Sequence, residues 1–176
     1  MTAINTTIMS TENLINQEAI DKLREMVDGI DIGMLGTYSH NNPFIHAVPM
    51  SRQEIDEQGT IWFLFSSSSE TFTHLQADSR VSLLYADIKG YNFLSVNGVA
   101  TISKDPARIE KYWNKWVEAW FEKGKEDPHI RVLQVKPVEA HYWDNKTNKL
   151  VSLVKLAASA LTGAKLDIGR QGNLSL

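Results

Sequence analysis

Short apolar segments separated by turn sequences run through the middle of the chain, and this alternation limits the fold more than any other feature. The turn signals, rich in Asn, Asp, Pro and Gly, lie at 40–43, 56–59 and 89–90. Because such turns join neighbouring strands, the pattern predicts antiparallel pairing. The segments that have strand character lie at 32–38, 44–51, 61–65, 81–86, 94–103 and 131–144. Six such strands predict an α+β protein whose small antiparallel sheet closes into a six-stranded barrel.

Helical patterns flank the predicted strands. The first begins with Asn16 as its N-cap and ends near Gly29, with apolar residues repeating along one face. A short helix is expected at 70–77, after the third strand. A further amphipathic helix is expected at 150–164, near the C-terminus. These segments therefore predict helices around the sheet, with no linker that would divide the chain into two domains.

One more helix is predicted after the fifth strand. Asp105 and Pro106 fit the N-cap and the first helical position. The aromatic residues Trp113, Trp116 and Trp120 then recur at helical spacing. We interpret this tryptophan stripe as core packing, because an apolar stripe at this spacing is typical of the buried face of a helix.

Composition excludes several classes of protein. The chain has 176 residues, no cysteine, 18 basic and 21 acidic residues, and a net charge of −3. The absence of cysteine excludes a disulfide framework, a thiolate metal site and a cysteine nucleophile. A slightly acidic chain is not typical of a nucleic-acid-binding protein. No apolar run is long enough to span a membrane, and the polar N-terminus does not resemble a signal peptide. We therefore expect a soluble cytoplasmic protein that binds neither nucleic acid nor metal.

The motifs of several common enzyme classes are missing from the sequence. There is no Gly-x-Gly-x-x-Gly fingerprint, no complete P-loop and no His-Glu-x-x-His motif. The five histidines show no metal-ligand spacing: His40, His46, His74, His129 and His141. We interpret them as turn, surface and strand residues, and no catalytic residue is identified. If the protein is an enzyme, we expect a bound cofactor to carry out the difficult step.

The second predicted strand contains a proline, which is the first candidate feature for ligand binding. Pro49 removes a backbone donor from the ladder and indicates an edge or a bulge. Free backbone groups near Val48, Met50 and Ser51 could then bond the polar edge of a ligand ring. The alternative is an edge strand that the proline merely protects from aggregation.

Four serines before the predicted short helix form the second candidate feature. Residues 66–69 are all serine, and Thr71 follows within the helix. Free N–H groups at a helix start, together with hydroxyl donors such as those of Ser66 and Ser67, form an anion site that fits a phosphate. The alternative is that these residues only cap the helix and shape the loop.

Two motifs in the second half of the chain resemble those of a known family and occur in the same order as in that family. The segment 120–128 reads WFEKGKEDP, 135–144 reads VKPVEAHYWD, and the chain continues at 156–163 with LAASALTG. With the Pro49-Met50 pair, these segments resemble the general stress protein 26 group of the pyridoxamine 5'-phosphate oxidase-like superfamily of FMN-binding split barrels. The resemblance covers about residues 13–165.

The resemblance implies an obligate homodimer of split β-barrels with FMN at the subunit interface. We expect one FMN-binding domain at 13–166, with flexible ends at 1–12 and 167–176. The family places the strand around Val48, Pro49, Met50 and Ser51 beside the flavin ring. It also implies that the loop with Ser66, Ser67 and Thr71 holds the phosphate, and that Trp143 lies near the pocket.

Two positions depart from the family pattern. The family usually has an arginine where this chain has Val48, and a lysine where it has Thr71. The loss of two hydrogen bonds from charged groups would cost about 3–6 kcal/mol of FMN binding energy. Arg52 shares a strand face with Val48 and Met50, so it is the one nearby cation that could compensate.

Two classes of function follow from these residues. The first is an FMN-dependent oxidoreductase of the general stress group, with an unknown substrate. The second is a dimeric module, flavin-binding or cofactor-free, without turnover. The replacements at Val48 and Thr71 favour the second class, whereas the family resemblance favours flavin binding.

Overall fold

The computed structural model describes residues 9–39, 42–145 and 169–176, which form a mixed α+β fold around one sheet. Its strands are β1 (Met9–Thr11), β2 (Leu14–Ile15), β3 (Ile32–Ser39), β4 (Asn42–Ile55), β5 (Ile61–Ser66), β6 (Arg80–Asp87), β7 (Asn92–Ser103), β8 (Ile130–Asn145) and β9 (Gly169–Ser175). The helices are α1 (Asn16–Asp28), α2 (Glu70–Ala77), α3 (Pro106–Tyr112) and α4 (Lys115–Glu118), with a 3₁₀ turn, η1, at Gly124–Glu126. None of these helices is long and apolar enough to cross a membrane.

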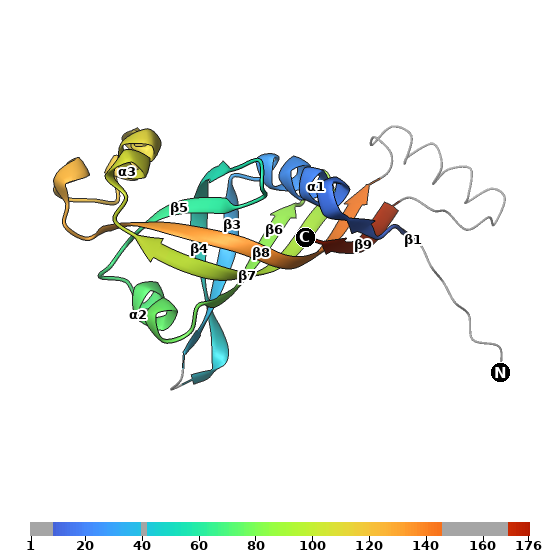
Figure 1. Cartoon of the computed structure of the whole chain (residues 1–176), viewed down its shortest axis with the longest axis horizontal. Coiled ribbons are helices and arrows are strands. Elements are labelled where there is room, and N and C mark those ends of the chain that lie inside the picture. The colour runs from blue at the N-terminus through green and yellow to red at the C-terminus, as the bar shows by residue number, and fades with distance from the viewer. Residues whose placement is uncertain (1–8, 40–41, 146–168) are drawn as a thin grey trace.

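Six strands form a closed ring of pairings (Figure 1). The order is β8, β5, β4, β3, β6 and β7, and the long antiparallel pairing of β7 with β8 closes the ring. Each of the six corresponds to a strand predicted from the sequence, and every pairing within the ring is antiparallel. The prediction of six antiparallel strands is therefore confirmed, and the six strands form a closed ring.

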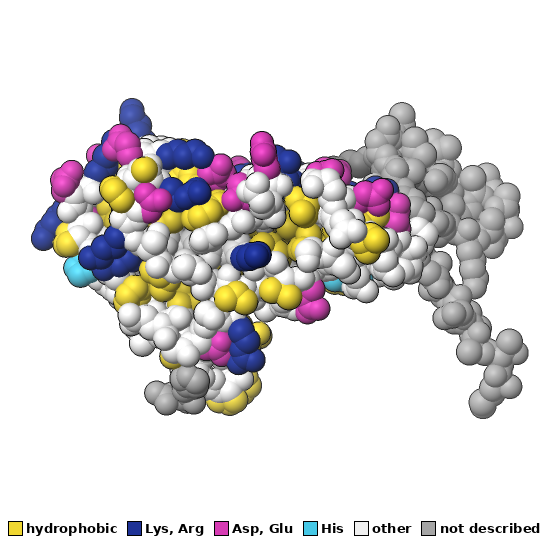
Figure 2. All heavy atoms as spheres, in the orientation of Figure 1, with side chains coloured by type: hydrophobic (Ala, Val, Ile, Leu, Met, Phe, Trp, Pro, Cys, Tyr) yellow, Lys and Arg dark blue, Asp and Glu magenta, His cyan; other side chains and the backbone are white. Residues whose placement is uncertain are grey.

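The core lies inside this ring and beneath α1. Alternation along the strands places one set of side chains inward, as in β6, where Val81, Leu83 and Tyr85 are all buried. Helix α1 adds Ala19, Leu23, Met26 and Val27 to the same cluster of buried apolar residues. The helix thus covers the core with its apolar face, and the charged side chains visible near α1 lie on the outside (Figure 2).

The C-terminal end is a strand, where the sequence predicted a flexible end over 167–176. Strand β9 pairs antiparallel with β8, from Asn145↔Gly169 to Glu139↔Ser175, and parallel with β1 on its other side. Leu174 is only 1% exposed. A Cβ on Gly172 would lie 1.8 Å from the carbonyl oxygen of Glu12, so glycine is required for the N-terminal segment to pass this close. The sequence did not predict β9 as a strand because most of its residues are polar. Strand β1, which lies in the predicted flexible N-terminus, also joins the sheet.

The helix predicted from Asp105 is divided, and the interpretation of its tryptophans as core is wrong for two of them. Asp105 caps α3 as expected, but α3 ends at Tyr112. Asn114 then begins α4, because its side chain accepts hydrogen bonds from the N–H groups of Trp116 and Val117. This break changes the orientation of the following residues. The two outward tryptophans are Trp116, 86% exposed, and Trp120, 83% exposed.

Two further helix predictions have different outcomes. Asn16 is not the N-cap of α1: it is the first helical residue, has a φ of 53°, and follows Ile15 in the cap position. The helix predicted at 150–164 lies outside the described residues.

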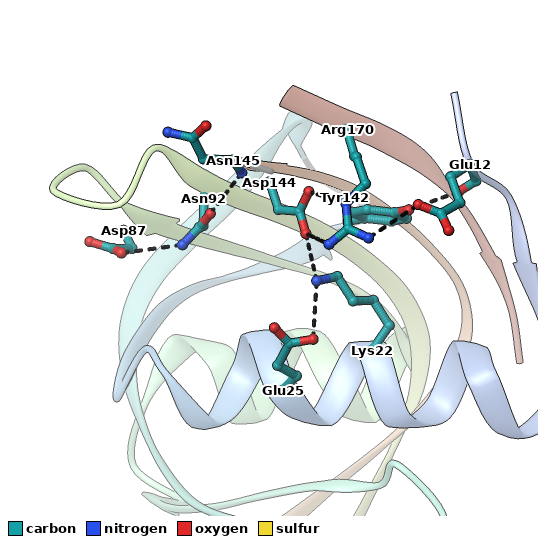
Figure 3. Close-up of polar contacts among 9 residues, drawn as sticks. All are labelled: Glu12, Lys22, Glu25, Asp87, Asn92, Tyr142, Asp144, Asn145 and Arg170. Carbon is teal, nitrogen blue, oxygen red and sulfur yellow. Dashed lines mark hydrogen bonds and ion pairs between the residues drawn. The ribbon is translucent and has the colours of Figure 1, made fainter. Parts of the chain in front are cut away.

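A buried ion network joins α1, β8 and β9 (Figure 3). The Lys22 Nζ lies 2.6 Å from Asp144 Oδ2, and both side chains are less than 10% exposed. Arg170 Nη2 lies 2.8 Å from the same oxygen and its Nη1 lies 3.2 Å from Glu12. The Tyr142 hydroxyl donates to the carbonyl oxygen of Glu12. Because Asp144 accepts from both cations, it is the centre of the network that holds the chain ends on the ring.

Removal of the central carboxylate should destabilise the fold. In the variant Asp144→Asn, Lys22 loses its buried counter-ion, so we expect the free energy of unfolding to fall by about 3 kcal/mol. Urea unfolding measures this change. The control is Glu110→Gln, which breaks the exposed pair with Lys125 and should cost less than about 1 kcal/mol. Equal effects of the two substitutions would contradict a structural role for the network.

The same carboxylate makes the stability pH-dependent. Burial alone would raise the pKa of Asp144, but hydrogen bonds from Arg170 and Lys22 outweigh it and hold the pKa below its usual range. The network therefore contributes fully above the unfolded value of about 3.9, and its contribution is lost as the pH falls through the lowered folded value. Urea unfolding from pH 6 downward should show a shallower acid loss in Asp144→Asn than in the wild type. Parallel curves would contradict this assignment.

Candidate functional site

The first half of β4 is an open edge of the sheet. On one side, β4 pairs with β3 from Ile32↔Ser51 to Ser39↔Asn42. On its other side, β4 pairs with β5 only from Arg52 onward. Among the described residues, no strand pairs with residues 42–51 on that second side. Backbone groups there are consequently available to a ligand or to another chain, and Pro49 lies in the middle of this stretch.

The predicted site residues of β4 point to two faces. Val48 and Met50 pack against the core cluster inside the ring. Pro49 lies on the outer face, because it is paired with the exposed Met34. Ser51 pairs with Ile32 on that outer face. The strand therefore presents its backbone, rather than a row of polar side chains, at this edge.

Arg52 is already engaged elsewhere. Its side chain is 12% exposed and lies 3.3 Å from Asp28 Oδ1 and 3.5 Å from Asp31 Oδ1. These carboxylates belong to the end of α1 and the residues that follow it. The structure thus uses Arg52 to attach α1 to the ring, which leaves it poorly placed to replace a cation at Val48.

The serine loop is fixed by its own hydrogen bonds. Ser69 caps α2, since its hydroxyl accepts from the N–H of Phe72, and it donates to the Ser66 carbonyl oxygen over 2.7 Å. The Ser67 hydroxyl lies 3.2 Å from Nδ1 of His129. Thr71 is only 4% exposed. The loop is therefore held in shape, but the position of the expected lysine is buried.

A cavity of about 320 Å³ lies between the β3–β4 hairpin and α2. Its lining residues are Ser39, Asn42, Phe44, His46, Glu70, Thr73 and His74. The rings of His46 and His74 meet edge to face, with centroids 5.2 Å apart. The sequence did not predict that these two rings meet, because His46 and His74 lie on separate elements.

Trp143 lies apart from the other candidate residues. It pairs with Phe93 on β7, and its ring lies 4.3 Å from that of His141. On the outer face, β7, β6 and β3 lie between the Trp143 end of β8 and β4. The other way round the ring, β5 pairs with β8 only at residues 130–135, far along the strand from Trp143. One chain thus does not bring Trp143 to the open edge of β4.

Trp143 and Pro49 nevertheless share the outer face of the sheet, and this face carries several exposed apolar side chains beside the polar row of Ser82, Asn97 and Glu139. The register of β3, β6 and β7 places the following exposed hydrophobic residues on it: Ile32, Met34, Leu84, Phe93 and Val99. Leu84, near the middle, is 52% exposed. An apolar patch of this kind on a single chain is typical of a binding surface. We call these five residues the apolar face.

Residues 18–167 match the family model described as pyridoxamine 5'-phosphate oxidase like. The chain belongs to this family. The match covers most of the chain and confirms the resemblance carried by the sequence motifs.

Individual relatives support this membership. General stress protein 26 of Bacillus subtilis is 24% identical over 143 residues, which are 79% of this chain and 99% of the relative. Protein bli-3 of Neurospora crassa is 27% identical over 129 residues, or 68% of this chain, and the match spans 62% of bli-3. The solved structure of the general stress FMN/FAD binding protein from Xanthomonas citri is 28% identical. It superposes with a TM-score of 0.63 over 76% of this chain and 93% of that protein.

The cap of α2 sets the shape of the serine loop and gives a test of the local structure. Ser69→Ala removes the acceptor for the Phe72 N–H and the donor to Ser66, so we expect a loss of about 1 kcal/mol in the free energy of unfolding. Thermal or urea unfolding measures this loss. The exposed Ser68 is the matched control, and Ser68→Ala should change stability little. A neutral Ser69→Ala would mean that the loop is not held by this cap.

Proposed function

We propose that the chain forms a homodimer of split β-barrels that binds FMN at the subunit interface. We further propose that it acts as an oxidoreductase of the general stress group whose substrate is not identified. The observation that carries this proposal is the arrangement of the candidate residues. Pro49 and Trp143 both lie on the outer face of a single chain, with β3, β6 and β7 between them.

A second copy of the chain would bring a Trp143 close to the open edge of β4. If two apolar faces meet, the open edge of β4 in one subunit can lie near Trp143 of the other without any change within the subunits. The same contact would remove exposed side chains such as Ile32, Leu84 and Phe93 from water, which favours association. The name of the Xanthomonas citri protein, at 28% identity, supports a flavin as the ligand.

The residues present fit a flavin in part. The open edge of β4 offers backbone groups to a polar ring edge, and the loop offers the hydroxyls of Ser66 and Ser67. The two cations that the resemblance implies are absent. At their positions, Val48 packs against the core and Thr71 is buried. Nδ1 of His46 is buried and has no hydrogen-bond partner among the described residues.

The chain's own residues would bind and orient the cofactor. The backbone of residues 48–51 would fix the ring edge, and the serine loop would hold the phosphate end. Trp143 of the second subunit would cover the ring and exclude water. When bound, the flavin supplies the redox chemistry, which no side chain provides.

A flavin-binding or cofactor-free dimer without turnover is the second candidate. The missing cations at Val48 and Thr71 favour it, because they weaken the expected grip on a phosphate. The two candidates differ in a simple assay. An enzyme of the proposed kind should show bleaching of bound flavin by a nicotinamide donor and recovery in air, whereas a binding module should hold flavin without this cycle.

The dimer and the flavin site should be lost together. Leu84→Lys places a charge in the middle of the apolar face, on a side chain that is already 52% exposed, so the fold should survive while the dimer dissociates. We expect light scattering to report two chains for the wild type and one for the variant. We also expect quenching of FMN fluorescence only by the wild type.

The control for this experiment is Ile88→Lys, which adds the same charge in the turn after β6, where the side chain is 76% exposed. This variant should remain dimeric and bind FMN. A monomeric wild type would contradict the proposed assembly, and a dimer that leaves FMN fluorescence unchanged would contradict flavin binding.

A further inference from the structure

His141 is a titratable side chain on the outer face of the sheet, and the proposed function does not use it. It lies two residues before Trp143 on β8, so the two side chains share a face. Across the neighbouring strands, His141 pairs with Ser95 of β7 and with Asn173 of β9. The imidazole therefore lies beside the ring that would cover the flavin.

Two contacts hold the ring of His141. Its centroid lies 4.3 Å from that of Trp143, and the two ring planes are inclined at 54°. Its Nδ1 lies 2.7 Å from Oδ1 of Asn173. Because an amide oxygen only accepts hydrogen bonds, Nδ1 carries the hydrogen and donates it. A neutral imidazole has one such hydrogen, so Nε2 is an acceptor.

This Nε2 is open to a ligand. Among residues 9–39, 42–145 and 169–176, no group donates a hydrogen bond to it, and the ring is only partly buried. The side chains that face His141 from β7 and β9, Ser95 and Asn173, carry no charge. Along β8 the nearest charged group on this face is Glu139, whose carboxylate accepts a hydrogen bond from Asn97. His141 is thus an oriented acceptor that its own subunit leaves unused.

A row of directly paired residues runs across the outer face from the open edge of β4 to His141. In order across β4, β3, β6, β7 and β8, its members are Pro49, Met34, Leu84, Ser95 and His141. Trp143 lies one row further along the strands, roughly 7 Å away. A second copy that places Trp143 over a flat ring at the open edge of β4 therefore also brings His141 to the rim of that ring.

The oxidised flavin ring has one hydrogen that suits such an acceptor. Its polar edge carries a single N–H group, at N3, between two carbonyl oxygens. The carbonyl oxygens can accept from backbone N–H groups, which the open edge of β4 offers. The N3 hydrogen needs an acceptor instead, and a neutral imidazole nitrogen supplies one.

We propose that His141 is a specificity-determining residue of the flavin site, whose Nε2 accepts the N3 hydrogen of a flavin held at the open edge of the other subunit. This inference rests on the proposed function. Asn173 is the positioning residue, because its side-chain oxygen fixes which nitrogen of His141 is the acceptor.

A flavin methylated at N3 tests the assignment, because the methyl group replaces the hydrogen that His141 would accept. We expect the wild type to bind FMN about 5- to 10-fold more tightly than 3-methyl-FMN, as the loss of one hydrogen bond implies. His141→Phe keeps an aromatic ring beside Trp143 but has no nitrogen. It should weaken FMN binding by the same factor and leave 3-methyl-FMN binding unchanged, as measured by quenching of flavin fluorescence.

The matched control is His141→Gln, whose amide oxygen can still accept the N3 hydrogen. This variant should retain most of the preference for FMN, whereas a purely structural role of the ring would make it as defective as His141→Phe. A preference for FMN that is as large in His141→Phe as in the wild type would overturn the proposal. So would a wild type that binds both flavins equally, which would leave the flavin function in place. If neither flavin binds, the flavin function fails as well.

The tautomer can be measured without any flavin. The side-chain ¹⁵N signals of His141 in the flavin-free protein should show the hydrogen on Nδ1, and Asn173→Ala should remove this preference. A hydrogen on Nε2 of the neutral ring in the wild type would overturn the proposal, whatever the protein binds.

Discussion

The antiparallel pairing of β7 with β8 is the contact on which the rest of the structure depends. It runs from Phe93↔Trp143 to Ser103↔Val132 and converts a row of strands into a closed ring. A bulge between Asn97 and Gly98 lets these long strands bend, and a Cβ on Gly98 would lie 2.6 Å from a backbone oxygen. Closure gives the inward side chains a complete core and leaves β8 long enough to hold β9 at its end.

The closed ring also explains why the candidate site is divided. A ring of six strands uses its inner face for the core, so ligand-binding groups must lie at an open edge, in a loop or on the outer face. The open edge of β4, the serine loop and the histidine cavity lie together, as the His46–Glu70 contact shows. Trp143 lies on the outer face, across the sheet, and the residues of the apolar face lie between it and the open edge.

The sequence predicted the ring strands well because alternation and turn residues are local signals. It failed where long-range contacts decide the structure. The polar strand β9 forms because β8 offers it an edge and Gly172 lets Glu12 approach. Trp116 and Trp120 are exposed because the side chain of Asn114 restarts the helix. Within the candidate site, residue type is enough to indicate the strand and the serine loop. The contact between His46 and His74 is set by the packing of α2 on the sheet, which the sequence does not show.

The central proposal is that two copies of this chain form a dimer that binds FMN at the subunit interface. Sedimentation of the purified protein with added FMN, followed at a wavelength where only the flavin absorbs, tests it most directly. The account predicts that the flavin colour moves in a boundary with the mass of two chains. Flavin that remains in the slow boundary of free FMN, or that moves with a single chain, would contradict the account.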